Sequence, residues 1–280
     1  MPQTINTNIA SLNAQRNLSS SQSSLSTSMQ RLSSGMRINS AKDDAAGLAI
    51  AERMNAQVKG MNVAIRNAND GVSLVQTAEG ALAKVGDSLQ RMRELSVQAR
   101  NATNSSSDRD SLNKEFGQLQ KEITRVLGGT AFNGKHMLGA DATNMTFQVG
   151  ANVTDDDIIQ IKTTDMTSDT DIKAVTTGVA IDGNATVSDI GDVISAIDTA
   201  INTVNDQRAD FGAAQSRFEA VISNLQQSVE NQSAARSRIM DADFAVETSN
   251  MSRAQILQQA GTAMIAQANQ APQQVLRLLQ

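Results

Sequence analysis

The chain has no cysteine, no tryptophan and no tyrosine, and only two prolines among its 280 residues. The absence of cysteine excludes disulfides, thiolate metal ligands and thiol catalysis. Six phenylalanines are the only aromatic residues, which is too few to fill a wide globular core. An elongated helical bundle tolerates this shortage, because its core is a narrow seam of Leu, Ile, Val, Met and Ala. The composition therefore favours a helical bundle over a compact globular domain.

Charge and hydropathy exclude several further classes of protein. The net charge is −5 and the isoelectric point is near 5.0, and the sequence lacks the basic stripe that a nucleic-acid partner requires. No run of 18 apolar residues occurs, so we expect no membrane span and no membrane partner. The first eight residues lack the basic start and apolar block of a secretory signal peptide. A secreted form would therefore leave the cell by another route.

Candidate catalytic and metal-binding residues are few, and each has a simpler explanation. His136 is the only histidine, and without a second histidine or a cysteine it does not make an ordinary zinc site. The acidic run at 155–157 lacks the ligand spacing and glycine turn of a calcium loop. Gly128-Gly129 is not followed by the Lys-Ser pattern of a phosphate-binding loop. We expect no metal, no cofactor and no enzymatic activity, because no convergent catalytic group is present.

Apolar residues recur at helical spacing near both ends of the chain. Alternating three- and four-residue steps place one residue per turn on a single helix face. Such a face needs a partner, since its small and flexible residues bury little area in an isolated helix. We therefore predict that both faces take part in assembly. The predicted subunit-packing seam consists of Leu25, Met29, Leu32, Met36, Ala254, Leu257, Gly261, Met264, Ala268, Val275 and Leu278.

A second, much longer helix is predicted after the first one. Ser40 followed by Asp43 is typical of a helix start, with the serine oxygen and the carboxylate serving the first free amides. The apolar series that follows runs over 54–95. At 1.5 Å per residue this helix would be about 80 Å long. Gly71 is its weak point, since glycine is about 1 kcal/mol worse than alanine inside a helix.

The middle of the chain changes period before helical spacing returns. Ser105 with Asp108 predicts the start of a short helix, whose apolar series covers 112–126. Apolar and polar residues then alternate on both sides of an acidic loop, which predicts a β-hairpin near 145–162. Residues 163–188 are rich in Thr, Asp, Gly and Ser, and we expect a loop or irregular β structure there.

Helical spacing returns over 190–229, and the polar stretch 231–243 is expected to connect this helix to the last one. The predicted fold is mainly α. It is an elongated antiparallel helical bundle or coiled coil with one small β-hairpin region.

Four stretches of the chain closely resemble the signatures of bacterial flagellins. They are QRLSSGMRINSAKDDAAG at 30–47, RNANDG at 66–71, SNMSRAQILQQAG at 249–261 and QANQ at 267–270. Similarity extends from the start of the chain to about residue 140 and resumes after about 188, so that a short variable segment near 140–188 lacks clear resemblance.

The resemblance implies a two-part organisation and a structural function. Residues 1–42 and 240–280 would form the terminal-helix inner-core domain of a hollow helical filament. Residues 43–239 would form a helical rod domain around it. The chain would be a structural subunit that polymerises into the bacterial flagellar filament for motility, in an extracellular location.

The resemblance also implies partners beyond the chain itself. Flagellins are exported unfolded by the flagellar type III apparatus and are held beforehand by a flagellar export chaperone. They polymerise under a filament cap protein, above hook-associated junction proteins. Four residues match the flagellin surface that Toll-like receptor 5 recognises on host cells. These are Gln90, Arg91, Leu95 and Glu115.

Two other interpretations remain open on the sequence. A hook-filament junction protein shares the terminal helices but caps the filament instead of extending it. A coiled-coil signalling or adaptor protein would explain the periodicity, although it would not need adhesive faces at both ends. Growth of long filaments from seeds would exclude both, because an adaptor keeps a fixed oligomer size.

Overall fold

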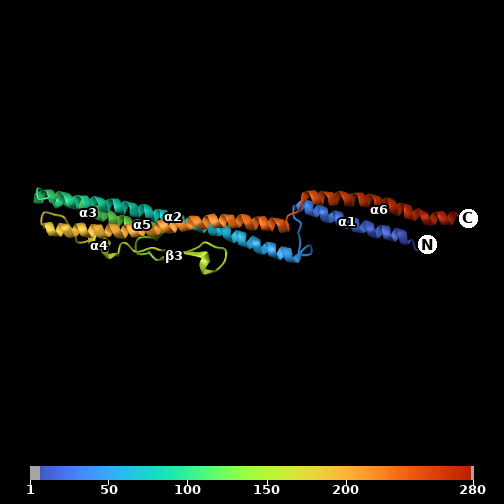
Figure 1. Ribbon diagram of the computed structural model, residues 1–280, viewed down its shortest axis with the longest axis horizontal. Coiled ribbons are helices and arrows are strands. Elements are labelled where there is room, and N and C mark those ends of the chain that lie inside the picture. Colours follow the sequence, from blue (N-terminus) through green and yellow to red (C-terminus); the bar gives the residue numbers. More distant parts are fainter. Residues whose placement is uncertain (1–6, 279–280) are drawn as a thin grey trace. The chain divides into compact units, whose positions relative to one another are not determined.

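The computed structural model describes residues 7–278, with side chains described as far as residue 270. It divides into two compact units. Unit 1 comprises Met1–Ala56 and Glu230–Gln280, and unit 2 comprises Gln57–Val229. Two long helices, α2 (Ala45–Ala99) and α5 (Val187–Met240), contribute to both units (Figure 1). None of the described helices combines the length and the apolar character needed to cross a membrane.

Unit 2 is a helical bundle in which α2, α3 (Ser106–Gly129) and α5 pack side by side (Figure 1). The predicted apolar series of α2 is confirmed, since its members over 54–95 are buried or half-buried. The scarce aromatic residues are concentrated in this core. Three of the six phenylalanines are fully buried there: Phe116, Phe211 and Phe218. The predicted mainly α bundle with a small β region is therefore correct.

The predicted start of α3 is confirmed as a capping box. The Ser105 hydroxyl donates to a carboxylate oxygen of Asp108 at 2.7 Å, and the Asp108 amide donates back to Ser105 Oγ at 3.2 Å. The hydrogen bond from the Ser105 hydroxyl, followed by that from the Ser105 amide, holds the pKa of Asp108 below its ordinary value. The charged carboxylate is thereby favoured at the amino end of the helix, where it complements the helix dipole.

The predicted start of α2 is wrong by one turn. Asp43 accepts hydrogen bonds from the amides of Asn39 and Ser40 and from the Ser40 hydroxyl, but these close a turn that precedes the helix. The helix begins at Ala45, and Asp44 caps it by accepting from the Gly47 amide at 2.8 Å.

The predicted β-hairpin is present and packs on the helices of unit 2. Strands β3 (Asn144–Gln148) and β4 (Ile158–Lys162) pair antiparallel, with Phe147 opposite Ile159. Asn67 on α2 donates to the Gln148 carbonyl at 3.0 Å. The Phe147 ring meets Phe218 of α5 edge to face, at 5.5 Å between ring centroids. The hairpin thus covers one side of the α2 and α5 contact.

Several elements differ from the sequence predictions. The segment 163–188 contains a short helix, α4 (Thr170–Thr176), which the Asp169 carboxylate caps. A second small hairpin joins β1 (Ala131–Phe132) to β2 (Lys135–His136) through a turn at Asn133-Gly134, where both residues have positive φ. A single 3-10 turn, η1 (Asp155–Asp157), precedes β4. Helix α5 continues to Met240 through the polar stretch that we expected to be a connection.

Candidate self-assembly surface

Helices α1 (Ile9–Ser34) and α6 (Phe244–Leu278) form an antiparallel pair in unit 1. Three contacts fix its direction. The Asn8 side chain donates to the Ala268 carbonyl at 2.8 Å, Leu18 packs on Gly261, and Arg31 is paired with Glu247 at 3.0 Å. The residue numbers of the partners fall on one helix as they rise on the other, as an antiparallel pair requires.

The contact between α1 and α6 follows a seven-residue repeat of small, polar and apolar side chains. Buried and half-buried positions alternate at three- and four-residue steps, as in a coiled coil. On α1 they are Ser11, Ala14, Leu18, Ser21, Leu25, Ser28 and Leu32, and on α6 they are Glu247, Met251, Ala254, Gln258, Gly261, Ile265 and Ala268. Small side chains allow close approach but bury little apolar area.

The structure places the predicted seam residues on two different faces. Five of them are buried or half-buried within the pair, namely Leu25, Leu32, Ala254, Gly261 and Ala268. Four others point outward, with exposed fractions of 56% for Met29, 38% for Met36, 51% for Leu257 and 61% for Met264. The side chains of Val275 and Leu278 lie outside the described residues. The predicted residues therefore divide between a contact within the pair and side chains that the pair leaves exposed, and their role in packing between subunits stays a prediction.

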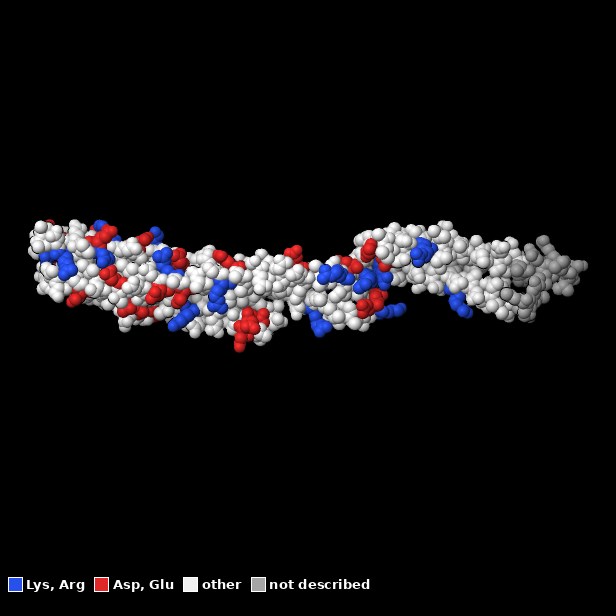
Figure 2. Space-filling view, in the orientation of Figure 1, with Lys and Arg blue, Asp and Glu red and all other residues white. Residues whose placement is uncertain are grey.

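The outer surface of the pair is apolar and poor in charge. Its exposed large side chains are Ile9, Leu12, Met29, Phe244, Val246, Ile256, Leu257 and Met264, and Met36 is exposed just after α1 ends. Helix α1 carries only Arg16 and Arg31 as charged residues, and α6 carries only Arg253 and Arg277 after Glu247. The face visible in Figure 2 accordingly shows few coloured side chains over α1 and α6. Large apolar side chains exposed on helices with so little charge favour contact with other protein chains.

One ion pair is enclosed within the α1 and α6 contact. The Glu247 side chain is only 7% exposed and the Arg31 side chain 29% exposed. Arg31 lies in the last turn of α1 and Glu247 in the first turn of α6, so each charge complements the dipole of its own helix.

Unit 1 also contains a joint where both chain segments change direction. Helix α1 ends at Gly35, whose φ of 70° lies in the left-handed region that glycine tolerates. The Gly35 carbonyl accepts from the Ala242 amide at 2.9 Å, and the Arg37 amide donates to the Met240 carbonyl at 2.6 Å. The Arg37 guanidinium donates to the Ile239 carbonyl at 2.7 Å. The break after α1 and the break before α6 are therefore tied to each other.

Comparison with known proteins identifies the family of this chain. A model of the bacterial flagellin N-terminal helical region matches residues 5–143, and a model of the C-terminal helical region matches residues 194–279. The chain is 45% identical to a flagellin of Halalkalibacterium halodurans over 275 residues, which covers 98% of this chain and 99% of that relative. The chain belongs to the bacterial flagellin family.

Other flagellins match over the full length of the chain. A flagellin of Xenorhabdus nematophila is 46% identical over 314 residues and is aligned over 100% of both chains. A flagellin of Bacillus subtilis is 44% identical over 303 residues, covering 98% of this chain and 99% of the relative. This flagellin is a structural subunit of the flagellar filament and not an enzyme, and the junction-protein alternative is not favoured. Membership of the family implies that its principal partner is itself.

The residues that we predicted to match the receptor surface of flagellins lie on α2 and α3 of unit 2. Gln90, Arg91 and Glu115 are exposed, whereas Leu95 is 1% exposed and lies in the core beneath them. Arg91 donates to Glu115 at 2.8 Å and to Glu94 at 2.9 Å. The hydrogen bond to Glu115, with a second one to Glu94, raises the pKa of Arg91 above its ordinary value. The arginine therefore links the two helices by a charge-assisted bridge.

Groups that could serve a metal or a reaction are scattered. The described part of the chain contains no cluster of three or more His, Cys, Asp or Glu side chains that could hold a metal ion. His136 is an exposed residue of β2, and residues 155–157 form the exposed or half-buried turn η1.

Proposed function

We propose that this flagellin polymerises by packing the outer apolar surface of α1 and α6 against the same helices of neighbouring copies. The observation that carries the proposal is the number of large apolar side chains that the pair leaves exposed, on helices almost without charge. An interface between different faces of identical subunits gives a helical filament when its rotation does not close into a ring. In this proposal residues 1–42 and 240–280 form the inner-core domain, and residues 43–239 form the rod domain around it.

The magnitudes are consistent with cooperative assembly. Each exposed side chain is about half accessible, and covering it would contribute roughly 1 kcal/mol, given 1.5–3 kcal/mol for burial of a whole side chain. Association itself costs on the order of 4–15 kcal/mol. One or two covered side chains therefore do not offset the cost of association. A filament end can cover many of these side chains at once, and it then binds an added subunit stably. Growth from existing ends is favoured over spontaneous association.

Seeded growth tests this function directly. Purified chain is mixed with short sheared filaments and followed by light scattering and electron microscopy. We expect long filaments to extend from the seeds and little growth without them. Seeds that stay short, or an oligomer of fixed size at every concentration, would instead indicate a junction or adaptor protein.

Secretion and accessory partners are further parts of the proposal. We propose that the chain is exported unfolded by the flagellar type III apparatus after an export chaperone has held its C-terminal region, and that it assembles under a filament cap protein above hook-associated junction proteins. Family membership supports this route, as does the small-residue contact of α1 and α6, which costs little to separate. Equal amounts of the chain in the medium of cells with and without the apparatus would contradict it.

We also propose that Gln90, Arg91 and Glu115, supported from beneath by Leu95, form a surface that Toll-like receptor 5 recognises. Arg91→Glu should lower receptor activation by the monomer at least about tenfold, because it reverses a charge that is fixed by Glu115. Reporter cells that express the receptor measure this effect. The matched control is Lys84→Glu on the same helix, where a 75% exposed lysine pairs with Asp87. Equal activities of the two variants would contradict the assignment.

A further inference from the structure

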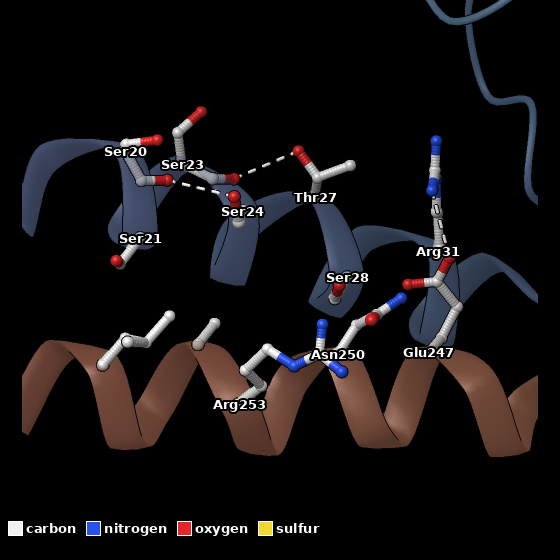
Figure 3. A pocket seen from close by; sticks show the side chains of 12 residues that line it. Ser20, Ser21, Ser23, Ser24, Thr27, Ser28, Arg31, Glu247, Asn250 and Arg253 are labelled. Carbon is white, nitrogen blue, oxygen red and sulfur yellow. Dashed lines mark hydrogen bonds and ion pairs between the residues drawn. The ribbon is translucent and has the colours of Figure 1, made fainter. Parts of the chain in front are cut away.

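A polar hollow lies along the contact between α1 and α6. Its volume is about 450 Å³. The α1 side contributes hydroxyl groups, including those of Ser24, Thr27 and Ser28, and the α6 side contributes Glu247 and Arg253 (Figure 3).

The hollow contains buried polar atoms that lack partners among the described residues. One Glu247 oxygen accepts from Arg31, but the other, Oε2, is buried and has no donor. Arg31 Nε is likewise buried without an acceptor. In Figure 3 the second carboxylate oxygen of Glu247 points away from Arg31, toward Ser28 and into the hollow. Leaving a buried carboxylate oxygen without a donor is unfavourable, so a ligand that reaches this oxygen with a donor, after a small movement of the Glu247 side chain, is favoured.

The remaining groups define what such a ligand must offer. The hydroxyls of Ser24 and Thr27 donate to the carbonyls of their own helix, both at 3.1 Å, so their oxygens are left to accept. Arg253 has no ion-pair partner within the described residues, and its guanidinium faces the hollow (Figure 3). A suitable ligand therefore combines an N–H donor for Glu247 and the hydroxyls with an oxygen acceptor for Arg253.

We propose that the hollow receives a carboxamide side chain, of Asn or Gln, from the terminal helices of a second copy of this chain. The proposal rests on the filament function proposed above. Leu257, a 51% exposed member of the outer apolar surface, also lines the hollow, so the hollow is continuous with that surface. A carboxamide is the side chain that offers both an NH₂ group and a carbonyl oxygen.

Charge excludes the ionised side chains of that surface, and a serine or threonine hydroxyl has one hydrogen to donate where a carboxamide has two. Helix α1 has no acidic residue, and α6 has none after Glu247, so a second copy cannot supply a carboxylate from these helices. An arginine would face Arg31 and Arg253. Exposed amides are abundant by contrast, and those of α6 include Gln255, Gln259, Gln267, Asn269 and Gln270.

The absence of native cysteine makes a direct test possible. Ser24→Cys places a single thiol in the hollow, and its reaction with a small methanethiosulfonate reagent is measured in the monomer and in seeded filaments. We expect the reaction to slow at least about tenfold in the filament. A thiol that reacts equally fast in both states would overturn the proposal. Thr27→Cys serves the same purpose if Ser24→Cys does not assemble.

A second arm identifies the group that enters. Copies with Ser24→Cys are assembled together with copies that carry cysteine in place of one exposed Asn or Gln of α1 or α6, and the filaments are oxidised. We expect disulfide-linked dimers for one amide position. The control is Ser26→Cys, which lies on the same helix but outside the hollow, and we expect no dimers when it replaces Ser24→Cys. A protected thiol that cross-links to no amide position would also overturn the proposal. Failure of the unmodified chain to elongate seeds would instead refute the filament function.

Discussion

Removal of residues 263–280 is expected to abolish filament growth while leaving unit 2 folded. The truncation removes the outward Met264 and the half-buried Ile265 and Ala268. It also removes the carbonyl that accepts the hydrogen bond from Asn8, so the first turns of α1 lose their partner. We expect the rate of elongation from seeds to fall at least about 100-fold. Such a loss corresponds to roughly 3 kcal/mol per added subunit, about what two or three covered apolar side chains contribute.

The truncated chain must first be shown to be folded. Its circular dichroism should retain a strong helical signal, because the described core of unit 2 does not use α6. The last buried residue of that core is Phe218, and only Val221 and Ile222 of α5 pack against it further along the chain. Electron micrographs of seeds incubated with it should show unchanged seed lengths. Filaments of normal length would refute the assignment of α6 as a polymerisation element, and loss of the helical signal of unit 2 would refute the independence of its core.

Gly71→Ala should destabilise unit 2 by about 2 kcal/mol, although alanine is the better helix former by about 1 kcal/mol. A Cβ atom at this position would stand 2.6 Å from Cζ of Phe218. The Phe218 ring is fully buried and is held at its edge by Phe147. Rotation of the ring about its own axis does not move Cζ, so only a shift of α5 or of the whole side chain can make room. The packing cost therefore exceeds the gain in helix propensity.

The same helix offers a matched control. Gly80 is exposed on α2, and a Cβ atom there would have no neighbour within 4 Å. Gly80→Ala should therefore stabilise the protein by up to about 1 kcal/mol through backbone entropy and propensity. Urea unfolding of both variants, followed by circular dichroism, measures the two free energies of unfolding. If both substitutions shift the unfolding midpoint upward, the packing explanation for Gly71 is wrong.

Gly71 also illustrates what the sequence could and could not predict. Periodicity identified α2 correctly, because one face of this helix is buried along nearly its whole length. Helix propensity marked Gly71 as a weak point, because a propensity scale considers only the residue itself. The space above this glycine is filled by Phe218, which lies 147 positions away in the sequence. This contact depends on tertiary packing and cannot be predicted from a local sequence pattern.

The terminal helices show why the inner contact was only partly predicted. Periodicity finds large apolar side chains, and on α6 these include Leu257 and Met264, which point outward. The inner face uses serines on α1, such as Ser11 and Ser28, that no apolar pattern detects. A surface reserved for another molecule looks like a core in the sequence, because both require the same residue types. The sequence therefore predicted assembly but not which face performs it.

Two further differences have local causes. Helix α5 continues through its polar last turns. There Arg236 donates to the Asn55 side chain at 2.7 Å, so a polar contact takes the place of the apolar seam that we had looked for. Helix α4 is only seven residues long. Its sequence signals are Asp169 as a cap and the buried pair Ile172 and Val175 three residues apart, and they were outweighed by the surrounding Thr, Asp and Ser.

The seven-residue repeat of the terminal pair makes its inner contact ambiguous in register. Leu18, Leu25 and Leu32 are each seven residues apart, and so are Ala254, Gly261 and Ala268. If one helix slid along the other by seven residues, about 10 Å, leucines would again meet small residues and most of the packing would be regained. The enclosed Arg31 and Glu247 pair and the tied joint at Gly35 and Ala242 have no equivalent seven residues away. A buried ion pair that adds little to stability can thus select one alignment among several nearly equivalent ones.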